Sequence, residues 1–66
     1  MFSVLFHDEF DDHAPHEYES FNNMTDAYNC YKQCCANGKL EMYDDGVELV
    51  YITDDDDTIT LDYHSF

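Results

Sequence analysis

The sequence contains no arginine and only two lysines, against sixteen Asp and Glu residues. Its formal net charge is -14. Because it has no basic patch to neutralise phosphates, direct binding to nucleic acid is excluded, and so is binding to an anionic membrane surface. Self-repulsion on this scale opposes compaction, so we expect the charge to serve a function.

The chain also lacks a long hydrophobic run, and no apolar stretch approaches the roughly 20 residues that span a bilayer. Residues 1–10 have no positively charged start and become acidic at Asp8, which argues against a signal peptide. Cys30, Cys34 and Cys35 are odd in number and crowded, a pattern typical of reduced thiols rather than of a disulfide scaffold. We therefore expect a cytoplasmic protein.

Glycine and proline are scarce, with two Gly and one Pro, so there is no glycine-rich phosphate loop. Aromatic residues are abundant instead. Six Tyr and five Phe can supply a core in a chain whose acidity would otherwise favour disorder. The length of 66 residues predicts a single domain, 1–66, that buries only about 60% of the surface its unfolded chain exposes.

The hydrophobic pattern predicts an α+β fold, with one helix packed on a small, mostly antiparallel sheet in the order β-α-β-β-β. Residues 1–6 are nearly all apolar and are predicted to form a buried strand. The polar residues 7–19 are predicted to form a long acidic loop. A β-meander is expected over 39–66, after the helix.

The helix is predicted over 23–37. Ser20, Asn22 and Asn23 are good N-cap residues, Asp26 suits the first turn, and Asn37-Gly38 is a good C-terminal stop. Apolar side chains recur between these ends at helical spacing, at Met24, Ala27, Tyr28, Tyr31, Cys34 and Cys35.

The period changes to that of strands after Gly38. Residues 40–43 and 47–53 are predicted strands, joined by a hairpin turn at Asp44-Asp45-Gly46. Residues 47–53 are apolar on both faces, as in a central strand. A second turn at 54–57 leads into a last strand, 58–66, in which apolar and polar residues alternate.

The carboxylates are spread along the chain, which is typical of a folded acidic surface rather than of a disordered tail. A compact domain of this length is roughly 28 Å across. Duplex DNA carries about 16 phosphates over that distance. The acid count is comparable, which favours competition with DNA for a cleft lined with Lys and Arg. Aromatic residues beside acids are candidate anchors, namely Phe10, Tyr18, Phe21, Tyr43, Tyr51 and Tyr63.

In size, charge and mixture of aromatic and acidic residues, the chain resembles the small acidic inhibitors that phages make against host enzymes. That class includes DNA-mimic antirestriction proteins, anti-CRISPR proteins and inhibitors of uracil-DNA glycosylase. The resemblance covers the whole chain but rests on no shared motif, and those families share no single fold. It implies an inhibitor that occupies the nucleic-acid site of a host protein, such as a nuclease, CRISPR effector, glycosylase or polymerase.

We therefore expect a basic nucleic-acid-binding protein as partner, bound through one contiguous negative patch, with the 7–19 loop as a second contact. The alternative is a generic interaction module that regulates a host protein through an aromatic surface, with little dependence on salt. An unprotected strand edge would also allow a homodimer. The predicted partner-binding residues are Tyr43, Asp44, Asp45, Glu48, Asp54, Asp55, Asp56, Asp57, Asp62 and Tyr63.

Metal and catalytic chemistry are less favoured by the sequence. His13-x-x-His16 has a spacing that could ligate zinc, but exposed histidines in an acidic loop are the commoner outcome. Residues 54–59 begin like a calcium loop, yet Ile59 stands where glycine is required. The cysteines lack a nearby Arg that would activate a thiolate, so they are predicted to pack rather than react. We expect no cofactor, no metal and no enzyme.

Overall fold

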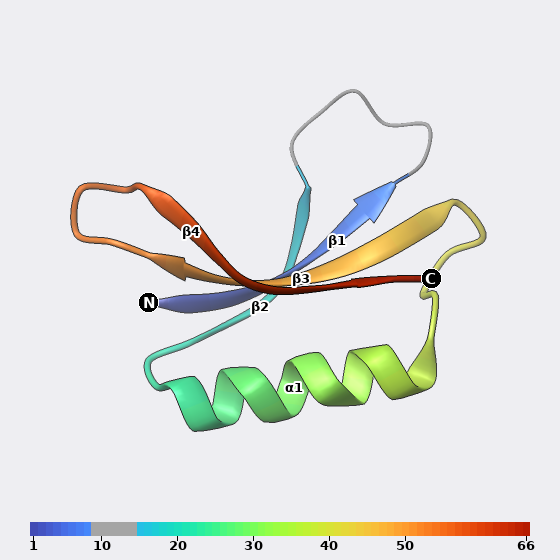
Figure 1. Ribbon diagram of the computed structural model, residues 1–66, viewed down its shortest axis with the longest axis horizontal. Helices are drawn as coiled ribbons and strands as arrows, with labels where there is room; N and C mark the ends of the chain where they lie inside the picture. Colours follow the sequence, from blue (N-terminus) through green and yellow to red (C-terminus); the bar gives the residue numbers. More distant parts are fainter. Residues whose placement is uncertain (9–14) are drawn as a thin grey trace.

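The computed structural model describes residues 1–8 and 15–66, and in these residues one helix packs against one sheet (Figure 1). The strands are ordered β2-β1-β3-β4 in the sheet, and all neighbouring pairs are antiparallel. The predicted α+β class, one helix on a four-stranded antiparallel sheet, is confirmed. Along the chain the elements are β1 (Phe2–Asp8), β2 (His16–Phe21), α1 (Met24–Asn37), β3 (Asp44–Ile52) and β4 (Thr58–Ser65).

The strand β2 lies just before the helix, in a segment that we expected to be mainly loop. β1 continues through Asp8, and β2 begins at His16, takes in the last four residues of the predicted loop 7–19 and ends at Phe21. The alternating acids of β2 conceal its strand character, but an edge strand with largely exposed side chains tolerates charge, which discourages further pairing. Predictions for Glu9, Phe10, Asp11, Asp12 and His13 fall outside the described residues.

Residues 40–43 do not form the strand that we predicted, and 44–46 do not form its hairpin turn. Residues 44–46 instead begin β3, while 38–43 connect it to the helix. Leu40 and Met42 are exposed, so their alternation with polar residues does not reflect a buried face. The β-meander therefore reduces to a hairpin of β3 and β4, with the predicted second turn between them.

The core is a single layer between α1 and the sheet. Val4 pairs with Leu49 and Phe6 with Val47, so these four side chains share the face toward the helix. The helix contributes one stripe centred on Tyr31, whereas the predicted members Met24 and Tyr28 are exposed. The buried core cluster is Val4, Phe6, Ala27, Tyr31, Cys34, Val47 and Leu49.

Both predicted helix ends are confirmed. Asn23 Oδ1 accepts a hydrogen bond from the Asp26 backbone N–H at 2.9 Å, and Asn23 Nδ2 donates to Asp26 Oδ2 at 2.9 Å. At the other end Gly38 has a φ of 79° and donates its N–H to Cys34 O. That positive φ is readily adopted by glycine, which explains its place after the last turn. No helix in residues 1–8 and 15–66 is long and apolar enough to cross a membrane.

We predict that Asn23→Ala lowers the free energy of unfolding by about 1 kcal/mol, because it removes the acceptor of an orphan helix N–H. The exposed neighbour Asn22 provides the matched control, and Asn22→Ala is expected to change stability by less than about 0.5 kcal/mol. Denaturant unfolding followed by far-UV circular dichroism measures both variants. Equal losses in the two variants would contradict the capping role of Asn23.

Candidate functional site

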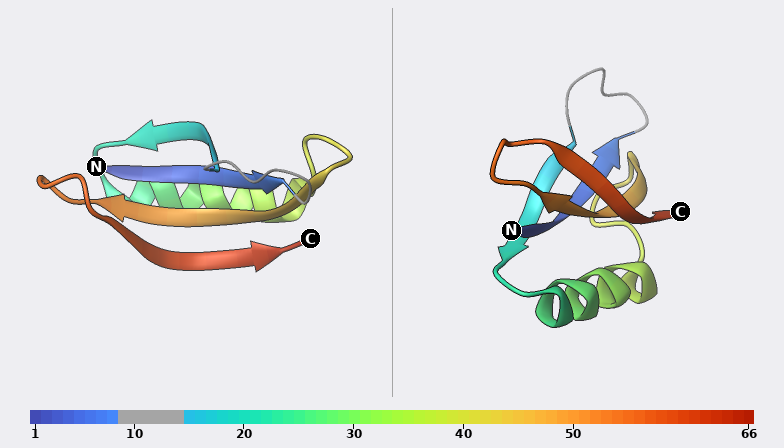
Figure 2. Two further views of the ribbon diagram at one scale, coloured as in Figure 1. Left: turned by 90° about the horizontal axis from the view of Figure 1, so that it is seen from above. Right: turned by 60° about the vertical axis from the view of Figure 1, so that its left-hand side comes forward.

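The sheet face opposite α1, called here the open face, carries polar side chains from all four strands. Since Val4 and Phe6 point to the helix, their neighbours Ser3, Leu5 and His7 point away from it. The register then places Glu17 and Glu48 on the open face, because each pairs with Leu5. Figure 2 shows α1 behind the sheet and the open face free of any helix.

Hydrogen bonds hold the two glutamates of the open face in fixed positions. Ser3 Oγ and Ser20 Oγ both donate to Glu17 Oε1, the first at 3.2 Å. The imidazole of His7 lies 2.8 Å from Glu48 Oε1, and Thr60 Oγ1 donates to Glu48 Oε2. These carboxylates are therefore preorganised, because their partners restrict the rotamers available to them.

The four consecutive aspartates at 54–57, called here the acidic turn, connect β3 to β4 and are all exposed. The turn is closed by Thr53. Its carbonyl accepts from the Asp56 N–H at 3.0 Å, its N–H donates to Asp57 O at 2.9 Å, and its Oγ1 accepts from the Asp57 N–H at 3.1 Å. Within the described residues, no hydrogen bond or ion pair to the carboxylates of the acidic turn is found. The fold therefore uses the backbone of this turn and leaves its charges to solvent.

Asp56 has a φ of 64°, in the left-handed region that asparagine and aspartate adopt more readily than other non-glycine residues, so aspartate suits the backbone of this position. A run of four like charges in a tight turn is nevertheless self-repelling. Because asparagine would suit the backbone equally well without the charge, the charge of the acidic turn is not explained by folding.

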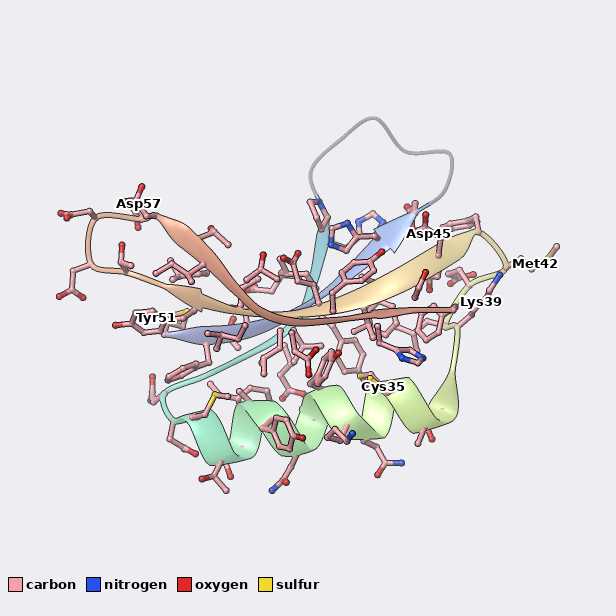
Figure 3. All side chains as sticks on the ribbon, viewed as in Figure 1. Cys35, Lys39, Met42, Asp45, Tyr51 and Asp57 are labelled. Carbon is pink, nitrogen blue, oxygen red and sulfur yellow. The ribbon has the colours of Figure 1, made fainter. Side chains whose placement is uncertain are left out.

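The predicted partner-binding residues are dispersed rather than gathered in one patch. Asp45 lies near the start of β3, and the acidic turn follows its far end, so the two lie at opposite ends of the molecule (Figure 3). The longest dimension of the fold is 32 Å. Asp62 pairs with Leu49 and therefore faces the helix side, away from Glu48 and Tyr63. Outside the acidic turn, Asp45 and Glu48 lie close to Tyr63, and both carboxylates raise the pKa of its phenol.

Asp44 is a structural residue. Its side chain is only 2% exposed, and its Oδ2 accepts the backbone N–H of Leu40 at 3.1 Å and of Glu41 at 2.9 Å. This carboxylate ties the 38–43 connection to the start of β3. We expected Asp44 at the binding surface, but its burial makes it inaccessible to a partner.

Tyr63 lies across Gly46 on the open face. A Cβ at position 46 would overlap the Tyr63 hydroxyl, so a larger residue there would force the Tyr63 ring to move from this position. The Tyr63 ring also meets the His7 ring edge to face, with 5.3 Å between the ring centroids. Partial burial, followed by the carboxylates of Asp45 and Glu48, raises the pKa of the Tyr63 phenol. Tyr63 thus remains a neutral hydrogen-bonding group near two acids.

A pocket, called here the corner pocket, lies where β1 and β2 meet the 38–44 segment and has a volume of about 170 Å³. Phe6, Tyr18, Leu40 and Tyr43 supply its apolar wall. Glu41 supplies an exposed carboxylate at its rim. His16, Glu17 and Asp44 also line the pocket, but the Glu17 carboxylate itself is held by Ser3 and Ser20 on the open face. The neighbouring Glu41 carboxylate raises the pKa of the Tyr43 phenol, with smaller effects of burial, Asp8 and Asp44.

The sequence identified only two elements of this pocket, Tyr18 and Tyr43, as aromatic residues beside acids. Leu40 was expected in a strand, and nothing in its local pattern indicates that residues 38–44 fold back toward Tyr18. The pocket depends on the turn that Asp44 holds, which is a tertiary feature.

The cysteines and histidines are the other groups that the sequence singled out for reactive or metal-binding chemistry. Burial raises the pKa of Cys34 to about 12, and also raises that of Cys30, so reactive thiolates are disfavoured at both positions. Cys34 packs in the core, as predicted. In the part of the chain that the structure describes, no group of three His, Cys, Asp or Glu side chains could hold a metal ion. His16 lies 2.7 Å from Asp8 Oδ2, while His13 is outside that part.

We predict that Asp44→Ala destabilises the fold by about 1–3 kcal/mol, since two N–H groups lose a charged acceptor. Asp45→Ala is the matched control, because Asp45 Oδ1 is buried without a hydrogen-bond partner among the described residues. Removing that carboxylate is expected to leave stability unchanged or to raise it. Denaturant unfolding of both variants tests the assignment, which fails if Asp45→Ala is the more destabilising change.

Comparisons with protein-family models, with curated proteins and with solved structures gave no significant match to this chain. The function is therefore argued from the residues and geometry of this chain alone.

Proposed function

We propose that this protein is an acidic inhibitor that binds a basic, nucleic-acid-handling protein inside the cell and blocks its nucleic-acid site. The observation that carries the proposal is the acidic turn. Its four carboxylates are exposed, have no partner within the described residues and oppose the fold that displays them. Charges that are costly to folding and are free of internal contacts are available to an external cation.

The dimensions of the molecule suit such competition. Its extents are 32 × 25 × 15 Å, and duplex DNA carries about 19 charges over a length of 32 Å at one per roughly 1.7 Å. The formal net charge of -14 is of the same order. Long-range attraction to a basic cleft would speed association, and the body of the fold would then exclude nucleic acid.

The open face and the acidic turn form the proposed contact surface. Hydrogen bonds fix Glu48 on the inner strand β3 and Glu17 on the edge strand β2, and Asp45 lies at the end of β3 opposite the acidic turn. A rigid display of charge loses less conformational entropy on binding than a disordered acidic tail would. The mechanism is steric and electrostatic competition and needs no catalytic group.

The second candidate is an interaction module that binds through an apolar surface. Tyr18, Leu40, Met42 and Tyr43 are all exposed, and three of them line the corner pocket. Binding through this surface alone would depend little on salt, whereas binding through the acidic turn and open face would weaken steeply as salt rises.

The proposal predicts that immobilised protein captures from a bacterial lysate a protein that is released by salt and that binds DNA or RNA. A labelled oligonucleotide bound to the captured protein should be displaced as the acidic protein is added. A captured protein without affinity for nucleic acid, or one that binds both ligands at once, would overturn the proposal.

We further predict that converting Asp54, Asp55, Asp56 and Asp57 together to Asn weakens this complex at least tenfold at low salt and reduces its salt dependence. The turn should survive, because asparagine tolerates the φ of position 56. Affinity is measured by calorimetry over a range of salt concentrations.

The control for this experiment is Glu19→Gln combined with Asp62→Asn, which removes two charges on the helix side of the sheet. Asp54→Asn with Asp55→Asn removes the same number from the acidic turn. The turn double variant should lose more affinity. Equal losses would mean that net charge alone matters and that the acidic turn has no particular role.

A further inference from the structure

The corner pocket has the size of a site for one side chain rather than for a cofactor. Its volume of about 170 Å³ lies below the roughly 300–1,000 Å³ of pockets that bind small molecules. A cavity of roughly 150 Å³ accommodates a group the size of a benzene ring. The pocket is therefore large enough for one planar or chain-like group that enters from a partner.

The walls of the pocket are apolar and incompletely covered. Tyr18 is 49% exposed, Leu40 54% and Tyr43 42%. Phe6 closes the inner side, and its ring meets the Tyr18 ring edge to face with 5.4 Å between the centroids. A group that entered here would cover the Leu40 side chain and the two tyrosine rings, which gives it an apolar contact surface.

The charge around this apolar space is negative. Glu41 lies at its rim, and the carboxylates of Asp8 and Asp44 are close enough to raise the pKa of the Tyr43 phenol. His16 also lines the pocket, with its imidazole 2.7 Å from Asp8 Oδ2, so these carboxylates outnumber the one imidazole beside them. The nearest lysine in sequence, Lys39, lies 3.5 Å from Met42 O, and no salt bridge between a lysine and a carboxylate is found in residues 1–8 and 15–66. The chain itself contains no arginine. An apolar space with an anionic rim complements a group with an apolar stem and a cationic head.

We propose that the corner pocket binds the side chain of an arginine on the partner protein, an inference that rests on the proposed function. The methylene stem would pack on Leu40, and the guanidinium would stack on a tyrosine ring while donating hydrogen bonds to Glu41. Arginine fits better than lysine, because its head is planar, weakly hydrated and able to stack. Proteins that grip phosphates are rich in such side chains.

The proposal is tested with the intact protein and three blocked amino acids: N-acetyl-arginine amide, N-acetyl-lysine amide and N-acetyl-citrulline amide. Citrulline keeps the shape of arginine without its charge. Titrations are followed by the NMR signals of the Leu40 methyl groups and of the Tyr18 and Tyr43 rings. We expect saturable shifts with arginine, with a dissociation constant on the order of 1 mM. The blocked lysine should bind several-fold more weakly than the blocked arginine, and the blocked citrulline should bind about tenfold more weakly or worse.

Two matched variants locate the site. Glu41→Gln should weaken arginine binding about two- to fivefold, the range expected for one exposed ion pair. Asp55→Asn removes the same charge from the acidic turn and should leave arginine binding unchanged. Leu40→Ser, at an exposed position, should weaken binding without unfolding the protein, which the dispersion of the amide spectrum verifies.

Shifts that do not saturate, equal binding of citrulline, or equal effects of Glu41→Gln and Asp55→Asn would overturn the assignment. Such a result would leave the competition with nucleic acid at the acidic turn and open face intact. Conversely, a captured partner without affinity for nucleic acid would overturn the proposed function while the arginine titration still reports on the pocket.

Discussion

A single layer of apolar packing between α1 and the sheet must hold together a chain whose charges repel one another. Seven buried side chains form that layer, and the formal net charge it must withstand is -14. At physiological ionic strength the Debye length is about 8 Å, so repulsion acts between neighbours but not between the ends of a 32 Å body. Placing Asp45 and the acidic turn at opposite ends of β3 therefore limits the electrostatic cost of the fold.

Local signals were sufficient to predict the helix, the central strand β3 and the turn at 54–57. Asn23, the 3.6-residue period and Gly38 each act within a few residues, so the helix can be recognised without tertiary information. β2 could not be recognised in this way. Its acids and aromatics gain their strand geometry from pairing with β1, a contact that the sequence does not display. The 38–43 connection is held by the carboxylate of Asp44, three and four residues further along the chain, a local contact that differs from the hairpin turn expected at 44–46.

The candidate site was predicted in its chemistry but not in its geometry. Exposure of the acidic turn follows from its sequence, because four aspartates cannot be buried. The placement of Asp62 could not be predicted, since the register of β4 shifts beside Leu49 and Val50. This irregularity puts Thr60 and Tyr63 on the open face although they are three residues apart, and leaves Asp62 on the other face. Simple alternation would have placed Thr60 and Asp62 together.

The two outer strands of the sheet, β2 and β4, each leave one side without a pairing partner in the described sheet. Glu17 and Glu19 lie on β2, Asp62 lies on β4, and the acidic turn directly precedes β4. Two molecules that approach side by side therefore meet like charges before their backbones can bond, which protects the protein from growing into fibrils. In molar salt the Debye length falls to about 3 Å, so this repulsion between edge strands is screened and edge-to-edge association is expected to begin.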